Sequence, residues 1–293
     1  MKKDRLVIAL QKSGRLSEKS FELLRKCGLD IIEGARCLIC RAEEFPADIL
    51  LLRDDDVPTF VSGGVCDIGI LGENVLIEQT HNTKEGENIE TVMKLGFSSC
   101  RLSVALPKGK KYGGPKTLEG FKIATSYPNL LQRFLDENKV SAAPVKMSSS
   151  VEVAPSLGLV DAICDIVSTG ATLEAHGLEE VEEIFSSQAV LISRRDMPEN
   201  KKIILNRLLE RIKGVKAAAT SKYVMLNAPK DKVKEIAALL PGSDSPTVIP
   251  LADPRKVAVH AVCSEPVFWD TMERLKAAEA TNILIISIEK MLQ

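Results

Sequence analysis

A hydrophobic run that passes directly into a cluster of small hydroxyl residues is the strongest single constraint on the fold of this chain. Ala162–Val167 is apolar and rich in β-branched residues, and residues 168–172 follow it as Ser-Thr-Gly-Ala-Thr. This pattern predicts a buried strand, a tight loop and a helix that begins near Thr172. A strand that leads through a glycine loop into a helix N-terminus suits an anion such as a phosphate group.

The residues of this loop are of the types that bind a phosphate group. Gly170 allows a close approach of the backbone, and Ser168, Thr169 and Thr172 supply hydroxyl donors. Most short Ser/Thr/Gly runs are ordinary turns or helix caps. The phosphate interpretation therefore needs support from the rest of the chain.

Carboxylates occur at two places that suit a ribose or a metal ion. Asp161 and Asp165 are four residues apart, so on a strand they share one face and could address a ribose diol or a metal beside the phosphate. The second place is Asp54–Asp56, which follows the predicted strand at residues 49–52. These three carboxylates are open to two interpretations, a helix-capping role or contact with substrate or Mg²⁺.

Composition and charge exclude several classes of protein. The chain has 293 residues, is 45% hydrophobic and 27% charged, and carries a net charge of −1, which is typical of a globular protein with two domains and a smaller module. We expect no general affinity for nucleic acid. The apolar run at residues 6–10 is too short for a signal peptide or a membrane span, so we expect a cytoplasmic protein with no membrane partner.

Cysteines give no disulfide framework, because their number is seven and they are scattered along the chain. Cys37 and Cys40 have a zinc-like spacing, but no second pair answers them. Core packing is therefore the favoured interpretation, and no metal site is assigned to side chains of the protein.

The first hundred residues repeat the order strand, polar break, helix. The strand at residues 6–10 is followed by Lys12, Gly14 and Arg15, with Ser17 as the expected N-cap of a helix. In an open α/β sheet, ligands bind at the carboxyl ends of the strands, so these cations suit an anionic substrate. Two solvated cations at a turn remain the alternative.

The middle of the chain predicts a second lobe. Residues 101–122 contain six cations and one carboxylate and include a candidate strand, and residues 121–127 predict another strand before a helix at 129–138. We expect residues 177–183 to form a charged connector and residues 184–192 a strand that returns to the first lobe.

The last part of the chain has a different predicted order of strands and helices. A helical run at residues 201–211 precedes Gly214, and beyond it the pattern predicts a β-α-β-β-α-β order, which is typical of a ferredoxin-like module. Trp269 falls on the apolar face of the second predicted helix of this module, so we expect it in the core. Residues 244–247 and 251–254 bracket a short strand with hydroxyl, backbone and carboxylate groups that suit an amino acid ligand.

Five ordered segments resemble those of one family, the ATP phosphoribosyltransferases of histidine biosynthesis. The segments are Gln-Lys-Ser-Gly-Arg-Leu at residues 11–16, Arg-Asp-Asp-Asp-Val-Pro at 53–58, Asp-Ile-Gly-Ile-Leu-Gly-Glu-Asn at 67–74, Ala-Thr-Ser-Tyr-Pro at 124–128, and the stretch at 161–172. The resemblance extends over the C-terminal module, so it implies the long form, which carries a regulatory domain.

The resemblance implies an α/β fold with a two-lobed catalytic unit similar to periplasmic binding proteins and a C-terminal ferredoxin-like (ACT-like) regulatory domain. Residues 1–100 and 185–222 would form the first lobe, 101–184 the second, and 223–293 the regulatory domain. The implied reaction transfers the phosphoribosyl group of phosphoribosyl pyrophosphate to N1 of ATP with the help of Mg²⁺ and releases pyrophosphate. Histidine as inhibitor and a homo-oligomer, from dimer to hexamer, are also implied.

The same resemblance implies roles for residues that match the motifs. It implies catalytic roles for Lys12, Arg15, Arg53, Asp161 and Asp165. Residues implied to bind substrate are Gly14, Asp54, Asp55, Gly72, Glu73, Asn74, Arg101, Ser168, Thr169, Gly170, Ala171 and Thr172. Residues expected to line a histidine site are Asn227, Thr247 and Val262. The competing hypothesis is a catalytically silent regulatory or small-molecule-binding protein with the same two lobes, which would be expected to lose the phosphate loop.

Overall fold

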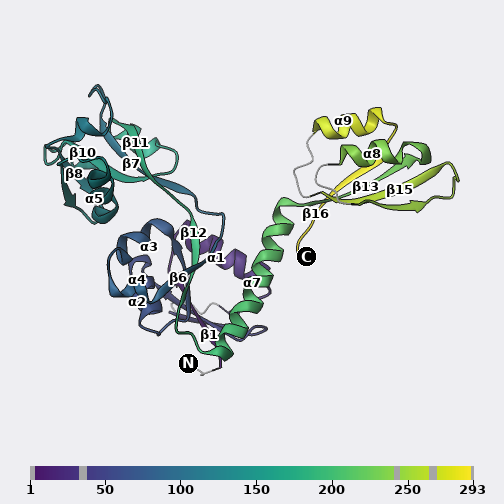
Figure 1. Cartoon of the computed structure of the whole chain (residues 1–293), viewed down its shortest axis with the longest axis horizontal. Helices are drawn as coiled ribbons and strands as arrows, with labels where there is room; N and C mark the ends of the chain where they lie inside the picture. The colour runs from purple at the N-terminus through teal and green to yellow at the C-terminus, as the bar shows by residue number, and fades with distance from the viewer. Residues whose placement is uncertain (1–3, 33–37, 241–244, 264–268, 292–293) are drawn as a thin grey trace. The chain divides into compact units, whose positions relative to one another are not determined.

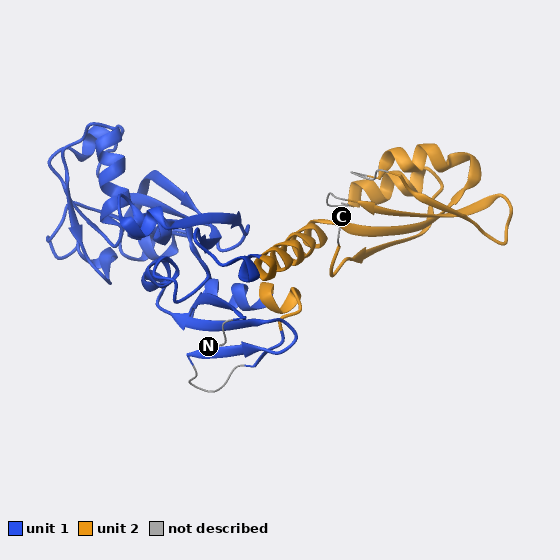
Figure 2. Cartoon of the chain, turned by 60° about the horizontal axis from the view of Figure 1, so that its bottom comes forward, with its two compact units in different colours: residues 1–22, 30–202 blue, residues 23–29, 203–293 orange. Residues whose placement is uncertain are grey.

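The chain folds into three β-sheets with their own helices. A computed structural model describes residues 4–32, 38–240, 245–263 and 269–291 (Figure 1). The chain divides into two compact units, residues 1–22 with 30–202 and residues 23–29 with 203–293 (Figure 2). No helix among the described residues combines the length and the hydropathy that crossing a membrane requires.

The first sheet has seven strands in the order β2-β3-β4-β1-β5-β12-β6. Its strands are β1 (Leu6–Gln11), β2 (Ile31–Ile32), β3 (Ile39–Ala42), β4 (Ala47–Leu52), β5 (Ile68–Gly72), β6 (Ile89–Lys94) and β12 (Ala189–Arg194). β1 runs parallel to both β4 and β5. The carboxyl ends of these three strands therefore share one edge, as the order of strands and polar breaks in the sequence predicts.

Short helices follow these strand ends. They are α1 (Arg15–Lys26), the 3₁₀ turn η1 (Asp54–Asp56), α2 (Val57–Ser62), α3 (Glu73–Thr80) and α4 (Lys84–Glu87). Side chains of β1, β5 and β12 pack with those of α2 and α3 in one buried cluster. The helix after β1 begins at Arg15, three residues before the start that Ser17 as N-cap would give, and Ser17 is a buried residue of its first turn.

The second sheet has five strands in the order β11-β7-β10-β8-β9. Its elements are β7 (Cys100–Pro107), η2 (Pro115–Leu118), β8 (Lys122–Thr125), α5 (Pro128–Glu137), β9 (Ala143–Lys146), η3 (Val151–Val153), β10 (Ala162–Val167), α6 (Ala171–Ala175) and β11 (Leu178–Ser187). β10 has the bounds that its sequence predicts. Both of its faces are covered, since Ala162 and Cys164 pack in one core cluster and Ile163 and Val167 in another, which explains its continuous apolar run.

The prediction of a charged connector at residues 177–183 is wrong, because residues 178–183 belong to strand β11. β11 is an edge strand that pairs only with β7, with register shifts at Glu180/Glu182 and Glu183/Phe185. An edge strand can leave charged side chains in water. The run of glutamates is therefore compatible with a strand. It interrupts the alternation of apolar and polar residues by which a strand is recognised in a sequence. The sequence analysis also missed β2, β3 and β6.

The third sheet is antiparallel, with four strands in the order β14-β15-β13-β16. Its elements follow the predicted β-α-β-β-α-β order as β13 (Lys222–Pro229), η4 (Lys230–Lys232), α8 (Val233–Leu239), β14 (Thr247–Pro250), β15 (Lys256–Cys263), α9 (Trp269–Ala277) and β16 (Thr281–Ser287). Alternate residues of β13 and β15 pack against Ile236 of α8 and Leu275 of α9.

Two expectations for the C-terminal part are corrected by the structure. The helix α7 (Glu199–Thr220) is longer than the predicted run at residues 201–211 and continues through Gly214, which the good helix propensity of the alanines at 217–219 permits. Trp269 is not a core residue, since it is 76% exposed at the first position of α9, where the side chain has no turn to pack against. The second compact unit contains residues 23–29 and 203–293, so it holds most of α7 as well as the third sheet.

Candidate functional site

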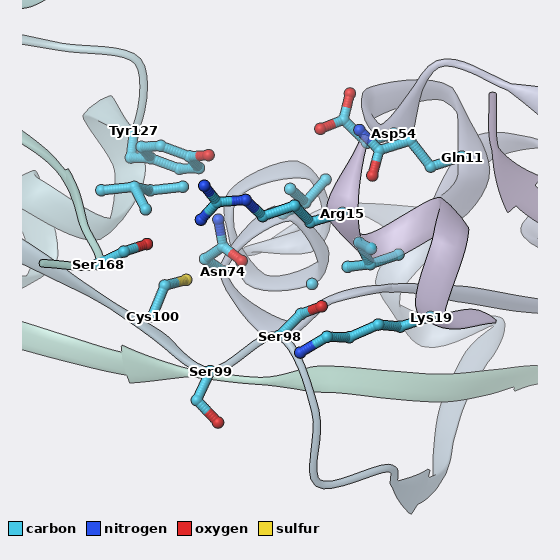
Figure 3. Close-up of a pocket in the computed structure, with 14 residues that line it drawn as sticks. Gln11, Arg15, Lys19, Asp54, Asn74, Ser98, Ser99, Cys100, Tyr127 and Ser168 are labelled. Carbon is cyan, nitrogen blue, oxygen red and sulfur yellow. The ribbon is translucent and has the colours of Figure 1, made fainter. Parts of the chain in front are cut away.

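A pocket of about 330 Å³ lies where the strand ends of the first and second sheets meet. The first sheet contributes loops that follow β1, β4 and β5, and the second contributes loops that follow β8 and β10. Its lining residues are Gln11, Arg15, Leu16, Lys19, Asp54, Gly72, Asn74, Val75, Ser98, Ser99, Cys100, Tyr127, Ile166 and Ser168 (Figure 3). The pocket therefore occupies the edge at which an α/β sheet binds its ligands.

Positive charge reaches the pocket from the helix that follows β1. Arg15 extends toward Asn74 and Tyr127, and Lys19 lies one turn further along α1 (Figure 3). Both side chains, and those of Lys12 and Arg53, have no ion-pair partner within the described ranges. Lys12 and Arg53 are exposed residues at the same strand ends, outside the lining of the pocket. The charges of Arg15 and Lys19 thus reach the pocket with no carboxylate paired to them in the described residues, whereas the charge of Arg53 acts on the neighbouring Asp55.

Asn74 is held at the floor of the pocket by its neighbours. It is 4% exposed, its backbone N–H donates to the Ser187 hydroxyl at 3.1 Å, and that hydroxyl donates to Asn74 Oδ1 at 2.8 Å. A Cβ at Gly72 would lie 2.3 Å from Asn74 Oδ1. Gly72 is therefore required by the position of the Asn74 side chain, not by a positive φ.

Tyr127 lines the pocket between acidic groups of both sheets. Burial raises the pKa of its phenol, the charges of Asp165 and Asp54 raise it further, and a hydrogen bond with the Asn74 side chain opposes the rise. Tyr127 therefore stays protonated at neutral pH and can donate a hydrogen bond. Burial likewise raises the pKa of Asp165 and, together with the charge of Asp54, that of Asp55.

The loop at residues 168–172 has the conformation that its sequence predicts. Gly170 has φ +82° and immediately precedes α6, and no atom lies within 4 Å of the Cβ that a substitution would add. Ser168 lines the main pocket, whereas Thr169 and Gly170 line an adjacent hollow with Lys108. Ala171 and Thr172 form the exposed first turn of α6.

Arg101 differs from the cations of the first sheet, because a carboxylate already neutralises it. Its guanidinium donates to both carboxylate oxygens of Glu180 at 2.5 and 2.6 Å, and it also donates to the backbone oxygen of Ser168 at 3.2 Å. The bond from Arg101 holds the pKa of Glu180 below its usual value. In this arrangement Arg101 supports the backbone of the loop at residues 168–172 instead of offering a free charge.

The two aspartates of β10 do not come together at the loop. Asp165 lies near enough to Tyr127 for its charge to raise the pKa of the phenol, whereas Asp161 precedes the strand and its Oδ2 accepts the backbone N–H of Lys122 at 2.9 Å. Seven residues separate Asp161 from Ser168, which corresponds to roughly 20 Å of extended strand. Asp161 therefore lies at the N-terminal end of β10, away from the loop that follows the strand.

Two further residues with an implied role in substrate binding have other contacts. Glu73 Oε1 lies 3.0 Å from Lys94 Nζ, and its backbone N–H donates to the backbone oxygen of Gln188. Gly14 adopts φ +96° directly before α1, where its carbonyl accepts the N–H of Glu18 at 3.1 Å. Neither residue is part of the lining of the pocket.

The three residues expected at a histidine site share one face of the third sheet. Thr247 pairs with His260, Val262 with Tyr223 and Asn227 with Ala258, so all three lie opposite the core face. Val262 is 41% exposed, and its register position is about 13 Å along β13 from Asn227. Asp244, part of the bracketing segment 244–247, lies outside the described residues.

Several pocket residues were missed by the sequence analysis. Tyr127 was part of a motif but received no role, and Gln11, Lys19 and the segment 98–100 received none either. Ser98 has φ +51°, a left-handed conformation that is uncommon for serine. No pattern in the sequence around residue 98 indicates such a turn, so only the fold reveals it.

Comparisons with known proteins agree with this geometry. The family model described as ATP phosphoribosyltransferase (HisG) matches residues 53–214, and the model of the HisG C-terminal domain matches residues 218–290. An ATP phosphoribosyl transferase (HisG:HisZ) complex from Thermotoga maritima contains a chain with 29% sequence identity and a TM-score of 0.60, over 71% of this chain and 96% of that chain.

Two other solved structures are similar at low identity. One is a histidine kinase sensor domain with similarity to periplasmic binding proteins, at 12% identity and a TM-score of 0.47 over 71% of this chain and 89% of that chain. The other is XAC2383 from Xanthomonas citri, at 14% and 0.48 over 74% and 84%. These similarities are too weak to support an inference about function. The family models cover the catalytic and C-terminal parts in turn, and the chain belongs to the ATP phosphoribosyltransferase family, in the form that carries the C-terminal domain.

Proposed function

We propose that the pocket between the first and second sheets is where this chain transfers the phosphoribosyl group of phosphoribosyl pyrophosphate to N1 of ATP, the first step of histidine biosynthesis. The observation that carries the proposal is a pocket lined by Arg15 and Lys19 from one sheet and by Ser168, the first residue of the glycine loop 168–172, from the other. A silent binding protein is not favoured, because the loop and its support are intact.

The reaction makes modest demands on the protein. A bond forms between adenine N1 and the anomeric carbon of the ribose, while the bond from that carbon to the pyrophosphate oxygen breaks. The nucleophile is a ring nitrogen and the leaving group departs as an anion, so positioning and charge stabilisation carry the catalysis. Arg15 supplies charge in the pocket, and residues 168–172 receive the 5-phosphate of the ribose.

Mg²⁺ fits this site as a partner of the substrate phosphates. The described residues contain no cluster of three or more His, Cys, Asp or Glu side chains that would hold a metal ion alone. Mg²⁺ commonly uses one or two carboxylates together with phosphate oxygens, and Asp54 is the carboxylate that lines the pocket. When bound there, the ion would neutralise charge on the pyrophosphate.

One mixing experiment tests the proposed reaction. Purified protein with ATP, phosphoribosyl pyrophosphate and Mg²⁺ should form phosphoribosyl-ATP and pyrophosphate in equal amounts. Asn74→Ala, which removes the Tyr127 and Ser187 partner, should lower this activity, whereas Lys213→Ala, at an exposed pair with Glu210 on α7, should not. The absence of both products from the folded wild-type chain would contradict the proposal.

Histidine inhibition belongs to the same proposal and is supported by the C-terminal domain that the chain carries. Free histidine binds the open face of the third sheet near Thr247 and lowers activity by favouring one arrangement of a homo-oligomer over another. Thr247→Ala should therefore weaken inhibition without changing activity in the absence of histidine. If histidine still inhibits Thr247→Ala and does so in competition with ATP, the inhibitor binds in the catalytic pocket instead.

A further inference from the structure

The helix α5 begins with a residue that cannot cap it. Its N-cap is Tyr127, which has φ −125° and ψ 61° and makes no side-chain capping bond. Ser, Thr, Asp and Asn are preferred at this position because a short side-chain oxygen accepts the free N–H groups of the first turn. A phenol cannot fold back in this way, so the first amides of α5 need another acceptor.

Glu78 provides that acceptor from a helix that follows the first sheet. Its Oε1 accepts the backbone N–H of Asn129 at 3.0 Å and its Oε2 accepts that of Leu130, also at 3.0 Å. The Asn129 side chain donates in return to the backbone oxygen of Glu78 at 2.8 Å. Glu78 is only 6% exposed. A carboxylate at a helix N-terminus is also favoured by the helix dipole.

Apolar contacts flank this set of hydrogen bonds. Ile77, the neighbour of Glu78 on α3, packs against the core of the second sheet, and Tyr127 packs against the cores of both sheets. The carboxylate of Glu78 is thus buried with both oxygens hydrogen-bonded and apolar side chains beside it. The α3–α5 contact therefore ties the two sheets together at a defined place.

The joint lies directly beside the pocket. Asn74 is in the first turn of α3 and Tyr127 immediately precedes α5, and both side chains line the pocket. We propose that Glu78 is a positioning residue: by capping α5 from α3, it frees residue 127 from the capping role and holds the Tyr127 phenol in the pocket beside Asn74. The kinetic part of this inference rests on the proposed function, whereas the structural part does not.

Two substitutions and one control separate the capping bonds from general stability. Glu78→Gln keeps the shape but has one carbonyl oxygen for two amides, and Asn129→Ala removes the return bond alone. The matched control is Glu137→Gln at the other end of α5, where the carboxylate is exposed and pairs with Arg133. Tyr112, in the same sheet's core cluster, serves as an internal reference for side-chain accessibility.

Two measurements then need no activity. Hydrogen exchange at the amides of residues 129 and 130 should rise at least tenfold in Glu78→Gln and stay unchanged in the control. Hydroxyl-radical labelling of Tyr127 should rise by at least twofold relative to Tyr112. Unchanged exchange or unchanged labelling in Glu78→Gln would overturn the inference, even if the chain proved inactive in the proposed reaction.

Steady-state kinetics complete the test. Glu78→Gln should raise KM about tenfold for at least one of the two substrates with a smaller change in kcat, and Asn129→Ala should show a weaker effect in the same direction. The Glu137→Gln control should match the wild type. If labelling of Tyr127 rises in Glu78→Gln but KM stays unchanged, Glu78 is only a structural cap of α5. That result would overturn its positioning role. A wild-type chain with protected amides but no product would refute the proposed function and leave the joint intact.

Discussion

The basic residues near the pocket differ between the first and second sheets in whether a carboxylate is already bound to them. Arg15 and Arg53, at strand ends of the first sheet, are exposed and have no ion-pair partner in the part of the chain that the structure describes. Arg101, at the start of β7 in the second sheet, is bound by both oxygens of Glu180. The number of basic residues at a site therefore overstates the charge available to a substrate. An unpaired cation can meet a phosphate, whereas a paired one holds a loop in place.

Arg15→Ala should give the largest effect on this comparison. Loss of one charged donor that acts on the reacting groups lowers kcat/KM by about 10²–10³-fold. Because Arg15 is exposed and unpaired within the described ranges, the melting temperature should hardly change. Arg133→Ala, an exposed cation on α5 outside the pocket, is the control. A fall in melting temperature with full activity per folded molecule would show that Arg15 has only a structural role.

The strand ends were accessible to sequence reasoning because they depend on local order. An apolar run followed by glycine and polar residues predicts β1, β5 and β10 with little reference to distant residues. The partner of Arg101 was not accessible, since Glu180 is 79 residues away and lies in a strand that its own charges disguise. The resemblance implies that Arg101 neutralises a substrate phosphate. This role remains a prediction, and the pairing of Arg101 with Glu180 argues against it.

The same limit applies to the aspartates and to the joint beside the pocket. Periodicity shows that Asp161 and Asp165 share a face of a strand, but it does not show which end of the strand meets the ligand. The capping of α5 by Glu78 joins residues about fifty positions apart, and a tyrosine at an N-cap gives no hint of where the acceptor lies. Such contacts follow from the packing of two sheets, which sequence patterns do not determine.

Gly170→Val tests the loop of the second sheet and has a matched control in Gly158→Val. Both glycines have a positive φ, +82° and +69°, and open space where a Cβ would go. Backbone strain should destabilise each variant by about 1–3 kcal/mol. Only Gly170→Val should also lower kcat/KM for phosphoribosyl pyrophosphate, by about a hundredfold or more, because the branched side chain blocks the approach of the phosphate. Equal activity of the two variants would show that this loop does not bind the phosphate.

Glu180→Gln distinguishes a supporting role of Arg101 from direct phosphate binding. If Arg101 holds the carbonyl of Ser168, both Glu180→Gln and Arg101→Ala lower kcat/KM by about tenfold, and the double variant is no worse than either one, because the residues act as a unit. A gain in affinity for pyrophosphate in Glu180→Gln would instead show that Glu180 restrains a substrate-binding cation.

The pH dependence of this pair has a definite sign. Because the pKa of Glu180 is lowered in the folded chain, its contribution to stability is complete above the ordinary glutamate range and is lost as the pH falls through the lowered pKa. The difference in unfolding free energy between wild type and Glu180→Gln should therefore be constant near neutral pH and shrink only in acid, as urea titrations at several pH values would show.

The smallest effects are expected from Asp161→Asn and Asp165→Asn, which test whether the two ends of β10 have different roles. Burial raises the pKa of Asp165, so its ionised form is disfavoured in the fold and its stability contribution decreases as the pH rises above the ordinary aspartate value. Asp165→Asn should therefore unfold at a higher urea concentration near neutral pH, while KM for phosphoribosyl pyrophosphate rises several-fold. Asp161→Asn should change neither quantity appreciably, because its amide oxygen can still accept the N–H of Lys122. Equal increases in KM for both variants would show that Asp161 also reaches the ribose, and that the strand ends are not separated in the working enzyme.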